Sequence, residues 1–159
     1  MRLNADFTQR AEVVACDDLW QRSPEMGVDR LMLDRVGGEV ARVTSIVRYD
    51  TGSSFARHEH AKGEEFLALE GVFTDETGDY PVGSYVRNPP CSLHASFSEQ
   101  GCRILVKLRR FADDDLRQSA IDTRDPSLCD VERGTLPLHS FAAERVHMQR
   151  LARADRRWQ

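Results

Sequence analysis

The chain has 159 residues, a net charge of −4 and an isoelectric point near 5.7. This length suggests one domain of ordinary size, large enough to bury a core without supporting disulfides. Charged residues make up 30% of the chain and aromatic residues 8%, a composition typical of folded proteins and not of disordered ones. The acidic balance argues against a nucleic-acid-binding protein, which usually presents a basic face.

The sequence also indicates where in the cell the protein is expected and whether its cysteines are paired. The first ten residues, MRLNADFTQR, lack the apolar core of a signal peptide, and no apolar stretch is long enough to cross a bilayer. We therefore expect a cytoplasmic protein with no membrane partner. The four cysteines, Cys16, Cys91, Cys102 and Cys129, are widely spaced and form no C-x-x-C pair, so we expect free thiols.

Strand patterns dominate the first two thirds of the chain. EVARVTSIVRY (39–49) and CRILVKLRRF (102–111) alternate with a period of two, which predicts half-buried antiparallel strands. GVFTDETGDYPVGSYV (71–86) predicts a hairpin in which Phe73 and Tyr80 flank a polar turn containing Gly78. Many short strands joined by tight turns predict an all-β fold, a small antiparallel barrel or sandwich.

The character of the sequence changes after Phe111, where a polar, turn-rich stretch begins. We expect residues 1–124 to form the compact domain and residues 125–159 to form a short C-terminal extension. Two readings of the extension stay open. Ser140 could cap a helix that buries Phe141, Met148 and Leu151. Alternatively, LPLHSFAAERVHMQRLA (136–152) is a weak, truncated repeat of LMLDRVGGEVARVTSIV (31–47).

A cluster of histidine and glutamate stands between two glycines in GSSFARHEHAKGEEFLALEG (52–71). Residues i and i+2 of a strand project from the same face, so His58 and His60 point into one space. A short turn brings Glu64 into that space from the next strand. Imidazole nitrogen and carboxylate oxygen suit zinc, iron, manganese, nickel or copper. Glu65, on the opposite face, is expected to be solvated or salt-bridged.

A further ligand is expected from GSYVRNPPCSLHASFS (83–98), where two prolines force a turn and His94 follows. Together the two segments resemble the two signature motifs of the cupin superfamily. The first motif matches at Gly52, His58, His60, Glu64 and Gly71, and the second matches at Gly83, Pro89 and His94. The second departs from the family pattern at Cys91, where cupins usually have glycine, and at Ser98, where they often have asparagine.

The resemblance narrows to the cupin domain of ChrR-type anti-sigma factors and their stand-alone relatives. It is carried by Leu-Glu-Gly-Val-Phe (69–73), by Asp75-Glu76-x-Gly78-Asp79-Tyr80, by Tyr85 to Pro90 and by Gly101-Cys102. It covers roughly residues 1–124. It implies a double-stranded β-helix, or jelly roll, that holds one divalent metal through His58, His60, Glu64 and His94. It also implies that residues 125–159 resemble the start of a second, truncated cupin unit.

Two expectations differ in the role that they give the metal. The resemblance favours a regulatory or stress-response module with zinc, because four protein ligands close a tetrahedral site. The alternative is a metal-dependent dioxygenase that acts on a small, ketone-like organic substrate, with iron, manganese or nickel leaving coordination positions open. The sequence alone leaves open whether the protein is an enzyme, and it assigns no catalytic residue.

Residues around the ligands supply expected pocket or supporting side chains: Phe66, Ala68, Tyr85, Arg87 and Cys91. Arg87 either holds an anionic ligand or forms a structural salt bridge, and we favour the salt bridge. The expected partners are a small-molecule ligand and a second copy of the chain. A sigma factor is not expected, because this chain has no counterpart of the N-terminal zinc-bound helical domain through which ChrR proteins grip it.

Overall fold

The computed structural model describes residues 1–38, 40–128, 135–141 and 144–149. The chain divides into two compact units, Met1–Ala120 and Ile121–Gln159. Almost all regular structure is antiparallel β-sheet, as the alternating patterns predicted. Within the described residues, no helix is long and apolar enough to span a membrane.

The first unit contains a short 3-10 helix, η1 (Asp17–Leu19), and ten complete strands. These are β1 (Arg2–Leu3), β2 (Trp20–Arg22), β3 (Val28–Gly37), β4 (Ala41–Tyr49), β5 (Ser53–His60), β6 (Glu64–Asp75), β7 (Gly78–Pro81), β8 (Ser84–Asn88), β9 (Ser92–Ser98) and β10 (Cys102–Leu108). The boundary between the units falls within β11 (Ser119–Asp122).

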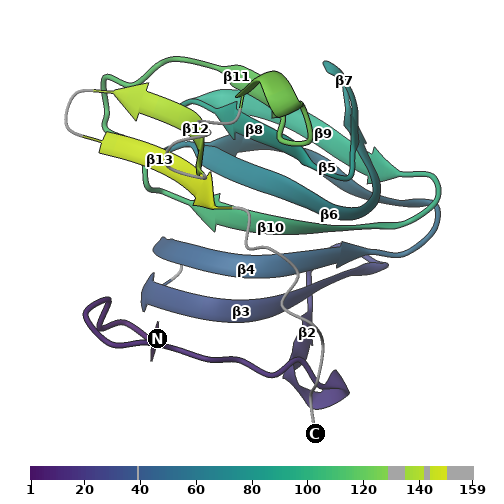
Figure 1. Ribbon diagram of the computed structural model, residues 1–159. Coiled ribbons are helices and arrows are strands. Elements are labelled where there is room, and N and C mark those ends of the chain that lie inside the picture. Colours follow the sequence, from purple (N-terminus) through teal and green to yellow (C-terminus); the bar gives the residue numbers. More distant parts are fainter. Residues whose placement is uncertain (39, 129–134, 142–143, 150–159) are drawn as a thin grey trace, which may run out of the picture. The chain divides into compact units, whose positions relative to one another are not determined.

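The strands of the first unit form two facing layers that share one strand (Figure 1). In one layer the order is β1-β3-β4-β10-β6-β8, and β2 pairs with β3. In the other, β5 pairs with β9, while β9 and β7 pair with the C-terminal half of β6. The hydrogen-bonded strands do not close into a ring, so the predicted small barrel is a jelly-roll sandwich.

The change of layer within β6 occurs at Gly71. Residues 64–71 pair with β10, with a bulge that leaves Leu69 unpaired, and residues 72–75 pair with β7. Gly71 has φ 66°, and a Cβ there would lie 2.0 Å from the carbonyl oxygen of Gly101. Only glycine fits this close approach of two backbones.

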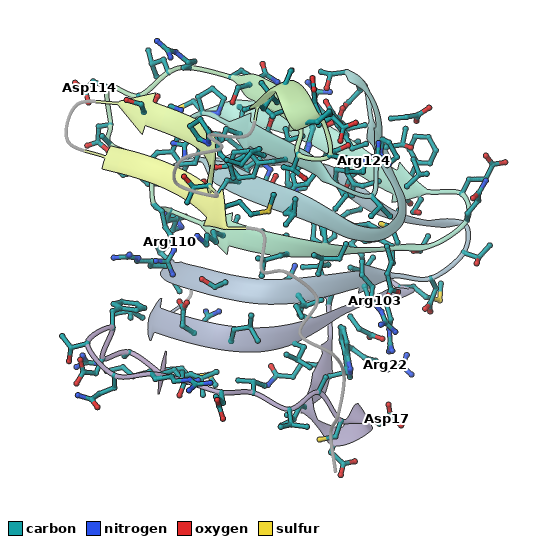
Figure 2. The ribbon with its side chains drawn as sticks, in the orientation of Figure 1. Asp17, Arg22, Arg103, Arg110, Asp114 and Arg124 are labelled. Atoms are coloured by element: carbon teal, nitrogen blue, oxygen red, sulfur yellow. The ribbon has the colours of Figure 1, made fainter. Side chains whose placement is uncertain are left out.

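Apolar side chains from both layers meet in one core. The core comprises Val28, Val47, Tyr49, Phe66, Ala68, Phe73, Val86, Cys102, Ile104 and Val106. Ile104 and Val106 are 2% and 4% exposed, whereas the charged side chain of Arg103, between them and Cys102 on the same strand, is more exposed (Figure 2). The burial of alternate residues along β10 confirms its predicted apolar face.

Two local predictions are also confirmed. Phe73 pairs with Tyr80 and Asp75 with Gly78, which places a two-residue turn at the predicted position of the hairpin. Cys16, Cys91 and Cys102 are free thiols. Cys129 lies outside the described residues.

The second unit contains a 3-10 helix, η2 (Pro126–Leu128), and the antiparallel hairpin of β12 (Thr135–Phe141) and β13 (Glu144–Gln149). Ser140 therefore lies in a strand, and the helical reading of this stretch is wrong. Leu151 lies outside the described residues. The alternating residues of 135–140 outweigh the weak capping signal at Ser140.

The hairpins β3–β4 and β12–β13 share an irregularity. The register of β3 shifts between Met32 and Asp34, and the register of β12 shifts between Pro137 and His139. The residue left unpaired is in each case the second leucine of Leu-x-Leu, Leu33 or Leu138. A common bulge is what a repeated unit would show. That residues 125–159 open a second cupin unit stays a prediction.

Candidate metal centre

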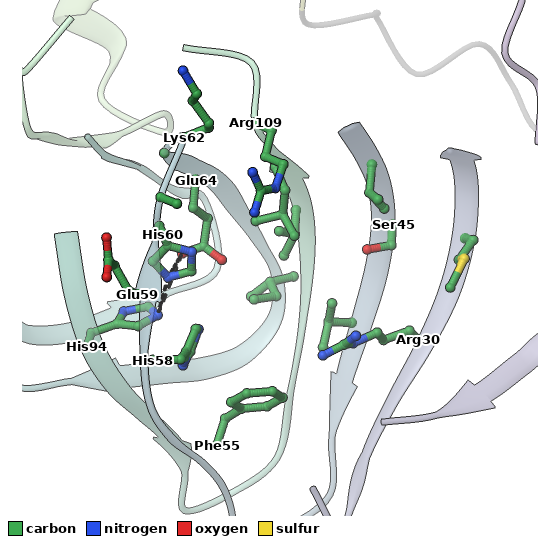
Figure 3. A pocket seen from close by; sticks show the side chains of 18 of the residues that line it. Arg30, Ser45, Phe55, His58, Glu59, His60, Lys62, Glu64, His94 and Arg109 are labelled. Atoms are coloured by element: carbon green, nitrogen blue, oxygen red, sulfur yellow. Dashed lines mark hydrogen bonds and ion pairs between the residues drawn. The ribbon is translucent and has the colours of Figure 1, made fainter. Parts of the chain in front are cut away.

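Three histidines from two paired strands meet at one place between the layers (Figure 3). His58 and His60 lie on β5, and His94 lies on β9, directly opposite His58 in the register of the two strands. Each offers a ring nitrogen, and these three atoms all lie within 4.8 Å of one another. The predicted convergence of the imidazoles is therefore present in the structure.

The donor atoms of two of these rings are close together. Nε2 of His60 lies 3.0 Å from Nε2 of His94, and both side chains are nearly fully buried. The ring centroids of the three pairs are separated by 4.6, 4.9 and 4.8 Å. Imidazole nitrogens this close together can bind a single cation.

Hydrogen bonds on the far side of two rings direct their lone pairs inward. Nδ1 of His94 lies 3.1 Å from Oδ2 of Asp75, and Nδ1 of His58 lies 2.8 Å from the carbonyl oxygen of Ala56. Both partners accept hydrogen bonds, so each Nδ1 carries the proton and donates it. Nε2 of each ring is then free to bind a cation, an arrangement common at metal centres.

The local charges act on these groups in opposite directions. Burial lowers the pKa of His60, although the carboxylate of Glu64 opposes the shift. Burial also acts to lower the pKa of His94, but its hydrogen bond to Asp75 and the charge of Glu64 outweigh this and raise it. Burial opposes ionisation of Asp75, yet hydrogen bonds from His94 and Thr77 lower its pKa.

Glu64, at the start of β6, lies beside two of the imidazoles. Its Oε2 is 3.3 Å from Nε2 of His60 and 3.7 Å from Nε2 of His94. Nδ2 of Asn88 donates a hydrogen bond to the same oxygen at 3.2 Å. Glu64 thus approaches the cluster from β6, the strand that follows β5, as predicted; among the described residues, the group whose donors all lie within 4.8 Å consists of the three histidines.

A cavity of ≈ 200 Å³ opens onto this cluster. His58, His60, Glu64 and His94 all line it, and its other walls come mainly from β3, β4 and β10. Val47, Ile104 and Val106 give it an apolar side. The donors therefore face a space that can hold a small molecule, and they are not sealed in the core.

The model of the ChrR cupin-like domain matches residues 8–112, about two thirds of the chain. The chain belongs to the ChrR cupin-like domain family. No curated protein sequence matches it significantly.

Solved structures similar to this cupin share its fold. An acetylacetone dioxygenase from Acinetobacter johnsonii is 21% identical, with a TM-score of 0.56, over 79% of this chain and 93% of that one. An RmlC-like cupin from Shewanella frigidimarina is 17% identical, with a TM-score of 0.50, over 65% and 96%. The complex of Rhodobacter sphaeroides SigE with the anti-sigma ChrR matches at 25% identity and a TM-score of 0.48, covering 56% of this chain and only 47% of that one.

None of the five residues expected around the pocket of this cupin is among the residues that line the cavity. Phe66 and Ala68 follow Glu64 at every second position of β6, and they pack in the core. The register of β6 with β8 pairs Glu65 with Arg87, so Tyr85 and Arg87 lie on the face opposite the histidines. There Glu65 is buried and ion-paired with Arg87 at 2.9 Å, which confirms the favoured salt bridge.

The fifth residue, Cys91, stands where cupins usually have glycine, and the structure shows how the turn accommodates it. It is exposed and has φ 65°, the left-handed conformation that glycine adopts without strain. Its backbone N–H donates to the carbonyl oxygen of His60 at 2.9 Å, so the turn keeps its contact with a candidate ligand. The turn therefore forms despite the missing glycine, at the cost of local strain.

Proposed function

We propose that this cupin binds one divalent metal ion through His58, His60, His94 and Glu64, and that the ion binds a small organic molecule in the adjoining cavity. The observation that carries this proposal is the cavity of ≈ 200 Å³ lined by all four side chains. A structural zinc site is closed by its protein ligands, whereas a site that acts on other molecules keeps positions open to them. We therefore favour metal-dependent chemistry of the dioxygenase type.

The residues that hold the site have distinct roles in this proposal. Asp75 and the carbonyl of Ala56 keep the protons of His94 and His58 on Nδ1, away from the ion. Asn88 holds the carboxylate of Glu64 in place. When bound, an ion such as iron supplies Lewis acidity and reactivity toward dioxygen.

A regulatory zinc module is the second candidate. It is favoured by the position of Glu64 beside His60 and His94, because a fourth protein ligand can complete a tetrahedron. The two candidates differ in whether exogenous molecules reach the ion. They predict different metals in the purified protein and different responses to added ligands.

Elemental analysis of the purified protein tests the metal site itself. We expect about one divalent ion per chain in the wild type, and at least a tenfold weaker affinity in His58→Ala and His94→Ala, since each removes one ligand. Glu59→Gln is the matched control, because Glu59 is an exposed carboxylate that lies between two ligands. Full metal content in His94→Ala would overturn the proposed ligand set.

Oxygen consumption by the iron-loaded protein tests the reaction class. Acetylacetone, the substrate named for one structural neighbour, and short oxo-acids form the first panel of compounds. We expect uptake of dioxygen that depends on both iron and substrate and is lost in His58→Ala. Tightly bound zinc together with a visible spectrum of the cobalt-substituted protein that no added compound alters would favour the regulatory module instead.

A further inference from the structure

Four basic side chains line the cavity, and they outnumber its acidic ones. They are Arg30, Arg35, Lys62 and Arg109, whereas the only carboxylates among its lining residues are Glu59 and Glu64. Glu64 is committed to the proposed metal site, and Glu59 is exposed to solvent. A cavity with this excess of positive charge, next to the divalent cation of the proposed site, attracts anions.

Three of these cations have another role or neighbour. Lys62 is ion-paired with Asp113, and Arg35 donates to the carbonyl oxygen of Gly38. Arg109 follows the end of β10 and lies at the same end of the cavity as Lys62 and Glu64 (Figure 3). None of these three is an obvious receptor for a ligand in the middle of the cavity.

Arg30 differs from them. It is partly buried on β3, and its guanidinium lies 5.6 Å from the centre of the Phe55 ring. Among the residues that the structure describes, no carboxylate pairs with it. Burial lowers the pKa of Arg30. A guanidinium partly shielded from water and without a paired carboxylate is suited to receive an anion.

Arg30 and the histidines lie on opposite layers of the sandwich, so a ligand that contacts both must cross the cavity. Arg30 is paired in register with Val47 on one layer, and the imidazoles come from β5 and β9 on the other. Figure 3 shows Arg30 across the cavity from His58 and His60. Val47, Ile104 and Val106 line the space as apolar walls. At ≈ 200 Å³ the cavity is smaller than most ligand pockets, which favours a short molecule.

We propose that Arg30 selects a short oxo-carboxylate, which binds the metal through its carbonyl oxygen and places its carboxylate on the guanidinium. The carbon chain between these groups then lies against the apolar walls. A guanidinium fork matches the two oxygens of a carboxylate and gives it a defined orientation. This inference rests on the proposed metal site. It specifies that the substrate is negatively charged and that Arg30 recognises its carboxylate.

Matched pairs of acid and amide test the inference. The probes are pyruvate with pyruvamide and 4-oxopentanoate with 4-oxopentanamide, which have the same number of non-hydrogen atoms but differ in charge. Binding to the cobalt-loaded wild type is followed in the visible spectrum of cobalt. Binding of the same acids to the metal-free protein is followed by the shift of its melting temperature.

The variants separate charge from packing. Arg30→Gln removes the charge, Arg30→Lys keeps it without the fork, and Arg22→Gln removes an exposed arginine of β2 that does not line the cavity (Figure 2). We expect the wild type and Arg22→Gln to bind at least one acid about tenfold or more tightly than its amide. Arg30→Gln should lose this preference, and Arg30→Lys should keep part of it, with metal content unchanged in all three.

Each outcome has one meaning. Equal affinity of the metal-loaded wild type for acids and amides, or an acid preference that survives in Arg30→Gln, would overturn the role of Arg30 while leaving the metal site intact. If the protein takes up no metal, the proposed function fails. In that case, an acid-dependent rise in the melting temperature of the metal-free wild type, absent in Arg30→Gln, would still support an anion site at Arg30, and no rise would overturn it.

Discussion

The orientation of one imidazole depends on one carboxylate. Asp75 stands at the end of β6, and its Oδ2 accepts the Nδ1 proton of His94, which turns Nε2 toward His60. Its other oxygen accepts hydrogen bonds from the backbone and hydroxyl of Thr77 and so is fixed by the hairpin turn. A residue that binds no metal thereby decides the direction in which a ligand presents its lone pair.

Asp75→Asn should weaken metal binding by about 10- to 100-fold without unfolding the protein. The amide oxygen can still accept from Thr77, but the negative charge that fixes the tautomer of His94 is lost. Asp79→Asn is the control, because Asp79 lies on the same hairpin and contacts Thr74 instead of a histidine. Competition with a coloured chelator measures the affinity, and equal affinities of the two variants would contradict this role.

Cys91 offers a stability test, because it holds a left-handed backbone conformation with a side chain. Cys91→Gly should raise the free energy of unfolding by about 1 kcal/mol, since glycine adopts this conformation without the steric penalty. Cys91→Ala removes the thiol but keeps the Cβ, so it should give no gain. Chemical denaturation measures both, and a gain in the alanine variant equal to that in glycine would point to the thiol and not to backbone strain.

The meeting of three candidate ligands could be predicted from the sequence because their spacing is local, whereas His94 was expected only from a second motif. His58 and His60 are two residues apart on a strand, and Glu64 follows after a short turn, so their meeting needs little knowledge of the fold. Asp75 was missed because it lies 19 residues from His94, although an acidic residue just before a hairpin turn was a visible signal. The carbonyl of Ala56 has no sequence signal at all, since every residue has one.

At the scale of elements, β6 ties the site to both layers. Its first residue, Glu64, reaches the histidines, and its last residue, Asp75, orients one of them. Between them Gly71 lets the strand pass from one layer to the other, against the backbone of Gly101. The spacing of Glu64 and Asp75 around the site therefore depends on this crossing.

Gly71→Ala should lower the free energy of unfolding by about 3 kcal/mol or more. The added Cβ would meet a carbonyl oxygen at 2.0 Å as well as forcing a strained φ. Gly52→Ala has nearly the same φ, 75°, but open space around the Cβ, so it should cost only about 1 kcal/mol. Urea denaturation compares them, and similar losses would show that the close approach to Gly101 is relieved at little cost.

Alternation predicted the faces of single strands but not which strands oppose each other. Tyr85 and Arg87, expected near the pocket, lie on the face of β8 that the register with β6 puts with Glu65, away from the histidines. The cavity is instead lined by residues of β3 and β4, including Arg30 and Val47. These strands precede the motif in sequence and meet it only through tertiary packing, which the period of a strand does not encode.

At the scale of the molecule, the core of the first unit adjoins the candidate metal centre but contains none of its proposed ligands. The core brings ten apolar residues together from both layers, and none of them is a proposed ligand. Folding of the sandwich therefore does not require the ion, in contrast to small zinc domains that are unfolded without metal. The ion should add stability only through its binding free energy.

Removal of the metal with a chelator should lower the melting temperature by about 5–10 °C while leaving the β-sheet spectrum unchanged. This range follows from about 2.7 kcal/mol of linkage at an ion concentration a hundred times the dissociation constant. Circular dichroism follows both quantities, with His94→Ala as the control that should show almost no response to the chelator. Complete unfolding of the wild type on chelation would contradict an independent core.

The central claim is that side chains from β5, β6 and β9 converge on a single ion. Anomalous diffraction from crystals of the metal-loaded protein tests it most directly. The claim predicts one peak within about 2.2 Å of Nε2 of His58, His60 and His94, on the side facing the cavity. A peak bound by other residues, or none near these three nitrogens in a protein that retains its metal, would contradict it.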